Sequence, residues 1–104
     1  MVTDVNYEKM LRNLRGSAKK RNIRFTLTLA ELMDLSLPLT CPILNVPIVY
    51  GGRGYNEYRA SVDRIDNDLG YVIDNIWIIS FLANRSKNSL SESELHKFAL
   101  FYQK

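Results

Sequence analysis

Apolar side chains near the start of the chain recur at helical spacing. Four of them stand at i, i+3, i+4 and i+7: Tyr7, Met10, Leu11 and Leu14. This periodicity predicts an amphipathic helix over residues 6–20. Gly16 weakens a helix of this kind, which leaves open an early end or a bend at that position.

Capping signals mark two further helices. Thr28 and Glu31 stand at capping-box spacing and predict a helix over residues 29–36. Ser91 and Glu94 repeat this spacing at the start of the last segment. An apolar stripe follows them: Leu95, Phe98, Ala99 and Tyr102. We expect this closing helix to pack its stripe against the core.

The segment between these helices reads as extended chain and loop. "CPILNVPIVY", residues 41–50, looks like two short extended runs joined at Asn45, which predicts a hairpin with Pro47 on an edge. "GGRGYNEY", residues 51–58, is a glycine-rich connector. A lone GGRG is weak evidence for RNA binding.

The centre of the chain has the order strand, loop, strand, helix. "ASVDRI" at 60–65 alternates in polarity, and "NIWIIS" at 75–80 is an apolar run rich in isoleucine, so both predict strands. "FLANRSKNS" at 81–89 predicts a short helix. Together these elements predict a single α+β domain over residues 1–104, with an N-terminal basic helix and a C-terminal packing helix.

Composition excludes several classes of protein. The 104 residues are 46% hydrophobic and 24% charged, as in an ordinary globular domain. No run of 18 apolar residues exists to span a membrane, and the N-terminus has no apolar signal core, so a cytoplasmic location is expected. Cys41 and His96 are each the only residue of their type. They cannot build a structural zinc site, so Cys41 is expected to be a small buried hydrophobe.

Basic residues gather between positions 9 and 24, and no acidic residue follows Glu8 within that segment. The cluster has seven members: Lys9, Arg12, Arg15, Lys19, Lys20, Arg21 and Arg24. Clustered positive charge is typical of proteins that bind nucleic acid. The alternative is a solvated helix face without a partner.

Polar residues of the central unit suggest a metal site. Asp63 falls on the first predicted strand and Asn84 on the short helix, which a strand pair packed on a helix can bring together. One carboxylate and one amide oxygen, completed by water and phosphate oxygens, suit Mg²⁺. Arg85 and Lys87 would then lie near the scissile phosphate, where positive charge stabilises the transition state.

The stretch "DRID…GY…DNIWIISFLANRSK" resembles the HNH (ββα-metal) endonuclease motif, especially the small forms of phages and mobile elements. It is also similar to the HNH domain of the RNA-guided CRISPR effector nuclease. The resemblance covers residues 60–88 as the ββα-metal core. It implies that Asp63 and Asn84 bind Mg²⁺ or Mn²⁺, and that Asn75 pins the loop between the strands. Family members with two CxxC pairs hold a structural zinc, for which Cys41 has no partner.

The chain departs from the family at the general base. The family has a histidine directly after the metal-binding aspartate, and here that residue is Arg64. An arginine stays protonated, although it can clamp a phosphate. Three substitutes are open: Asp66, which occupies the base position of a related D-R-G-H motif, His96, or a metal-bound hydroxide helped by substrate phosphate. We favour Asp66, because a low-dielectric site can raise the pKa of a carboxyl.

These features predict a metal-dependent endonuclease that nicks double-stranded DNA. Catalysis would involve Asp63, Arg64, Asp66, Asn75 and Asn84. Eight residues would contact nucleic acid: Arg64, Arg85, Lys87, Arg15, Lys19, Lys20, Arg21 and Arg24. The first alternative is a catalytically degenerate nucleic-acid-binding protein on an HNH-like scaffold, which the missing histidine favours. The second is a protein-binding adaptor or inhibitor without affinity for DNA.

Overall fold

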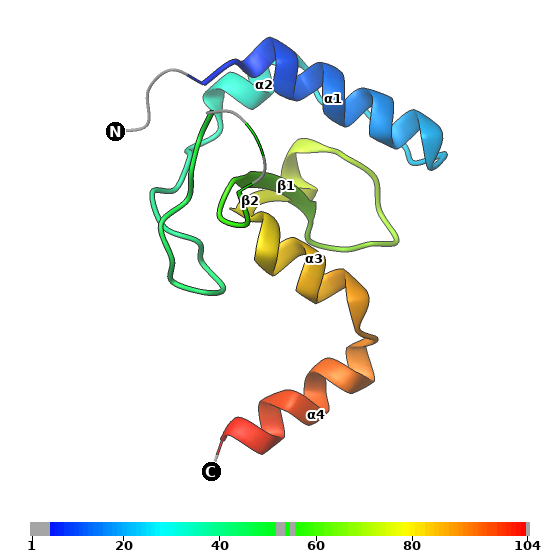
Figure 1. Ribbon diagram of the computed structural model, residues 1–104. Coiled ribbons are helices and arrows are strands. Elements are labelled where there is room, and N and C mark those ends of the chain that lie inside the picture. The colour runs from blue at the N-terminus through cyan, green and yellow to red at the C-terminus, as the bar shows by residue number, and fades with distance from the viewer. Residues whose placement is uncertain (1–4, 52–53, 55, 104) are drawn as a thin grey trace.

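The computed structural model describes residues 5–51, 54 and 56–103, which form a small α+β domain (Figure 1). Its sheet has two antiparallel strands, and α1 and α2 lie on the opposite side of it from α3. The elements in chain order are α1 Tyr7–Lys20, α2 Leu29–Asp34, β1 Ala60–Arg64, the 3₁₀ turn η1 Ile73–Asn75, β2 Ile76–Ser80, α3 Phe81–Ser89 and α4 Glu92–Tyr102.

The first helix, α1, agrees with the prediction for residues 6–20. Asn6 caps it by accepting a hydrogen bond from the backbone N–H of Lys9 at 3.0 Å. Leu11 and Ala18 are buried on its inner face. The helix runs through Gly16 without ending, because that position is exposed and its surroundings are open.

The second helix and the segment after it agree in part with the prediction. α2 has the capping box of Thr28 and Glu31 but ends two residues early, because Leu35 adopts an extended conformation. The chain then reverses at Asn45, whose φ is 57°. Its two arms form one isolated antiparallel bridge, between Thr40 and Pro47, so this segment is a narrow loop rather than a hairpin of two strands.

The central unit has the predicted order of strand, loop, strand and helix. β1 and β2 pair antiparallel, with Asp63 opposite Trp77. β2 continues directly into α3, whose N-cap is Ser80. The predicted helix over 81–89 is confirmed, and each strand is one residue shorter than predicted. Asn75 ends η1 instead of beginning β2.

The core lies between α1, α2 and the sheet. It includes Leu11 and Leu32 from the helices and Val62, Ile78 and Ile79 from the strands, with at most 8% of each residue exposed. Cys41 joins them at 1% exposure, as expected for a buried hydrophobe. Its sulfur accepts hydrogen bonds from the backbone and side chain of Ser80, both at 3.4 Å.

The last helix, α4, contradicts the prediction that its apolar stripe packs on the core. Figure 1 shows α4 turning away from the rest of the domain, and none of its residues is buried. Phe98 and Phe101 are 53% and 59% exposed. The prediction was wrong because Leu90 is extended and redirects the chain after α3. Among the described helices, α4 included, none has the length and apolar character needed to cross a membrane.

Candidate functional site

Polar side chains of β1 and α3 face one another. Alternation along the strand puts Ser61 and Asp63 on one face of β1. Helical spacing puts Asn84, Lys87 and Asn88 on one face of α3. Hydrogen bonds join the two faces, from Asn84 to Ser61 at 2.7 Å and from Lys87 to Asp63 at 2.7 Å. We call these five residues the polar row.

The carboxylate of Asp63 is the buried centre of the polar row. Asp63 is 3% exposed, and its Oδ2 accepts hydrogen bonds from Trp77 Nε1 at 2.8 Å and Lys87 Nζ at 2.7 Å. The same Nζ donates to the backbone carbonyl of Arg64 at 3.0 Å. A buried charge needs such compensation, because the protein interior solvates it poorly. A carboxylate and a carbonyl oxygen thus converge on one positive centre.

Asn84 occupies the other end of the polar row. Its Nδ2 donates to Ser61 Oγ at 2.7 Å, and its Oδ1 accepts from Asn88 Nδ2. Asn88 in turn accepts from Asn67 Nδ2 at 3.4 Å, which links the row to the loop after β1. Asp63 and Asn84 therefore share one strand–helix interface, and no hydrogen bond joins them directly in the described chain.

Asn75 holds the loop between the strands through the backbone. It is 5% exposed. Its Oδ1 accepts from the N–H of Asp66 at 2.9 Å, while its Nδ2 donates to the carbonyls of Asp66 at 3.0 Å and Gly70 at 2.9 Å. An amide side chain has two donor and two acceptor sites, and Asn75 makes three hydrogen bonds with them. The arrangement is the loop-pinning one that the HNH resemblance implies.

Arg64 also serves this loop in the structure. As the neighbour of Asp63 on β1, it points to the other face of the strand. Its Nη1 donates to the carbonyls of Asn67 at 2.8 Å and Leu69 at 2.9 Å, and its guanidinium carbon lies 5.5 Å from the centre of the Tyr71 ring. The residue at the family's general-base position is thus bonded to loop backbone instead of the Asp63 carboxylate.

Asp66, the favoured substitute base, lies exposed in the same loop, so the low-dielectric surroundings that favoured it in the sequence analysis are not present there. Its Oδ1 accepts from the N–H of Asp68 at 2.9 Å. It lines a hollow of about 610 Å³ together with Lys87, which connects it to the edge of the polar row. His96, the other side chain considered, lies exposed on α4. Glu92 and Leu95 at the start of this helix line the same hollow, but His96 is not among its lining residues.

Besides Arg64, the residues predicted to contact nucleic acid lie in two regions: α3, and α1 with the turn after it. Lys87 belongs to the polar row, whereas Arg85 forms an exposed ion pair with Glu57 at 3.1 Å. The basic residues of α1 and the turn after it are all exposed: Arg15, Lys19, Lys20, Arg21 and Arg24. Two of them contact aromatic residues: the guanidinium carbon of Arg15 lies 5.6 Å from the centre of the Phe25 ring, and Arg21 donates to the Tyr71 hydroxyl at 3.4 Å.

The sequence analysis missed three members of this hydrogen-bonded network: Ser61, Trp77 and Asn88. Two of them could have been found from spacing. Ser61 stands two residues before Asp63 on a strand, and Asn88 stands four residues after Asn84 on a helix, so each shares a face with a predicted ligand. Trp77 becomes visible only when the register of the two strands is known.

Comparisons with protein-family models, with curated proteins and with solved structures found no match for this chain. Its chemistry is therefore argued from the site itself. In the described residues no three His, Cys, Asp or Glu side chains come together as a metal-binding group. A cation at the polar row would have one carboxylate, that of Asp63, and otherwise neutral oxygen ligands.

Proposed function

We propose that this protein is a metal-dependent DNA endonuclease whose active site is the polar row between β1 and α3. One observation carries the proposal: Asp63 Oδ2 and the carbonyl oxygen of Arg64 converge on the Lys87 ammonium at 2.7 and 3.0 Å. These oxygens define a position for a cation beside a buried carboxylate. A flexible lysine chain holds that position and can leave it.

The donor atoms fit a hard divalent cation. Carboxylate and carbonyl oxygens are the ligands that Mg²⁺ and Mn²⁺ prefer, and Mg²⁺ commonly uses one or two carboxylates together with substrate phosphate. Asp63 Oδ2 and the carbonyl oxygen of Arg64 would hold the ion, and the Oδ1 of Asn84 would complete the set of protein ligands. When bound, it would supply Lewis-acid stabilisation of the phosphate and an activated water. Asn84 would first have to exchange its bond with Asn88.

The basic side chains of the site would position the phosphodiester. Lys87, displaced from Asp63, remains anchored on α3 beside the row and can neutralise a phosphate oxygen. Arg64, at the end of β1, stays bonded to the loop carbonyls of Asn67 and Leu69 and so holds the loop beside Asp63. The exposed basic residues of α1 give affinity for the DNA backbone without reading bases. Asp66 is the proposed proton acceptor, because it lies on the hollow that Lys87 lines.

A nicking assay on supercoiled plasmid tests this function. We expect cleavage in Mg²⁺ or Mn²⁺, none in EDTA, and a loss of at least about a hundredfold in Asp63→Asn, which keeps the shape of the side chain. Asp74→Asn is the matched control, because Asp74 is exposed in η1 outside the polar row. Equal rates for the two variants, or cleavage in EDTA, would overturn the proposal.

The same contacts also support a second function. Lys87 already neutralises Asp63, and Arg64 stands where the family has its base, so the scaffold would also suit a degenerate nucleic-acid-binding protein. Such a protein would bind DNA in a salt-dependent manner, with no cleavage in either metal by folded protein. The nicking assay and a binding titration on the same samples separate the two functions.

A further inference from the structure

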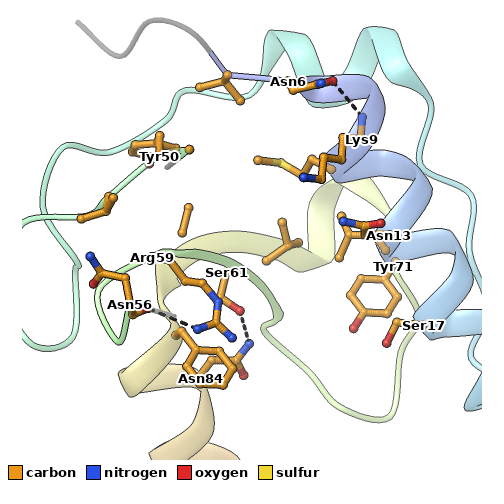
Figure 2. Close-up of a pocket in the computed structure, with 18 of the residues that line it drawn as sticks. Asn6, Lys9, Asn13, Ser17, Tyr50, Asn56, Arg59, Ser61, Tyr71 and Asn84 are labelled. Atoms are coloured by element: carbon orange, nitrogen blue, oxygen red, sulfur yellow. Dashed lines mark hydrogen bonds between the residues drawn. The ribbon is translucent and has the colours of Figure 1, made fainter. Parts of the chain in front are cut away.

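A cavity of about 680 Å³ lies between α1 and the central strand–helix unit (Figure 2). Figure 2 shows side chains of α1 along one wall, among them Asn6, Lys9, Asn13 and Ser17. Ser61 and Asn84 lie on the opposite wall. Because both also belong to the polar row, this cavity opens onto the proposed active site. We call it the α1 groove.

The charge of the α1 groove favours an anion. The chain carries 11 Asp and Glu residues, yet none of the described residues that line the groove is acidic. Three of them are basic: Lys9, Arg21 and Arg59. Tyr50, on the same lining, donates to the carbonyl of Pro38 at 2.6 Å, and burial, with a smaller contribution from Tyr7, raises its pKa to about 12. Tyr50 therefore adds no negative charge to the groove at neutral pH.

The groove also offers neutral hydrogen-bonding groups. Four amides line it: Asn6, Asn13, Asn56 and Asn84. The side chains of Asn13 and Ser17 are exposed and make no hydrogen bond within the described chain, so a ligand can reach them without breaking one. An asparagine amide matches the donor and acceptor edge of a nucleic-acid base, which a lysine or arginine on phosphate does not read.

We propose that the α1 groove binds unpaired nucleotides of a DNA strand, so that the substrate is single-stranded or locally unpaired DNA. This inference rests on the proposed function, because the groove leads to Asn84. Its size is that of cavities that take small ligands. A duplex is instead read by elements that enter its own grooves, whereas a concave, positively charged groove follows the backbone of a single strand.

Fluorescence anisotropy in EDTA tests the groove separately from cleavage. The probes are a labelled eight-nucleotide DNA strand (within the range of about 4–16 nucleotides that one single-strand-binding fold covers), the same strand in a blunt duplex, and an abasic strand of equal length. We expect the base-bearing strand to bind about tenfold tighter than either of the others. The abasic strand keeps every phosphate, so it reports what the bases contribute.

Two substitutions locate the binding. Asn13→Ala is expected to weaken binding of the single strand by about tenfold and to leave binding of the abasic strand unchanged, since one hydrogen bond is worth that factor. Alanine favours helix at this exposed position, so the variant should fold. Lys9→Gln is compared with Lys97→Gln, which removes the same charge from an exposed site on α4. Only Lys9→Gln should weaken binding.

Three results would overturn the inference: duplex binding as tight as single-strand binding, an abasic strand bound as well as the normal one, or no effect of Asn13→Ala. Failure of the two proposals can be told apart. Nicking of plasmid without a preference for the single strand would keep the nuclease and reject the groove. Base-dependent binding in EDTA without cleavage in any metal would keep the groove and reject the nuclease.

Discussion

Two neighbouring regions of this protein use polar side chains in different ways. On either side of the loop after β1, Arg64 and Asn75 hydrogen-bond to the backbone of that loop. In the polar row, Asp63, Lys87 and Asn84 bond mainly to other side chains. The two regions meet at β1, where Asp63 of the polar row is followed directly by Arg64.

The difference indicates which residues hold the fold and which can do chemistry. A side chain bonded to backbone fixes the path of the chain, and removing it leaves buried groups without partners. Bonds between two side chains make up only about 10–15% of hydrogen bonds in folded proteins, so a cluster of them is informative. Such bonds can be exchanged for a metal or a phosphate without moving the backbone.

Asn75→Ala should have the largest effect on stability. It removes bonds to the N–H of Asp66 and to the carbonyls of Asp66 and Gly70. We expect the free energy of unfolding to fall by about 3–4 kcal/mol, because each buried group left unpaired costs about 1–3 kcal/mol. Denaturant titration measures it. Asn67→Ala, an exposed amide of the same loop, should cost less than about 0.5 kcal/mol. Equal losses would remove the distinction between the two regions.

Gly70→Ala should be the next most damaging change. A Cβ at Gly70 would clash with the carbonyl oxygen of Arg24, which is backbone and also accepts from the N–H of Tyr71 at 2.8 Å. Overpacking of this kind costs about 1–3 kcal/mol. Gly16→Ala is the matched control with the opposite sign. Gly16 is helical and open, so alanine should stabilise the protein by about 0.5–1 kcal/mol. Thermal unfolding of both variants would show whether the loop is as tightly packed as its contacts imply.

Much of this architecture was predictable from the sequence, but the contacts were not. The period of the apolar residues predicted α1 and the strands, and the capping pairs at Thr28 and Ser91 predicted where two helices begin. The apolar stripe of α4 predicts an amphipathic helix, but it does not identify the surface against which the stripe would pack. The sequence also pointed to Asp63 and Asn84 without showing that Lys87 is bonded to Asp63, because that contact depends on how α3 packs on β1.

Lys87→Met tests the polar row directly. Without divalent metal it leaves the Asp63 carboxylate with Trp77 as its remaining side-chain donor among the described residues. We expect a loss of about 1–2 kcal/mol in the free energy of unfolding, less than the loss of about 3–5 kcal/mol for a fully buried pair, because the Lys87 side chain is 25% exposed. Millimolar Mg²⁺ should restore much of this loss, because a cation can take the vacated position. The parent protein should gain less from Mg²⁺, since Lys87 competes for the carboxylate. Lys97→Met, on α4, controls for the lost charge. A metal response equal in the variant and the parent would argue against a cation site at Asp63.

Removing α4 should have the smallest effect of all. None of its residues is buried, so a chain ending at Leu90 should unfold within about 0.5 kcal/mol of the parent, measured by denaturant titration. Because the loop and the polar row lie outside α4, the Asn75 bonds should not change. Nicking should persist as well, although the hollow beside Asp66 loses the wall formed by Glu92 and Leu95. This truncation also removes His96, so retained cleavage would exclude that side chain as the general base and leave Asp66 as the side chain to test. A loss of more than about 2 kcal/mol would show that the exposed stripe does pack on the domain in solution.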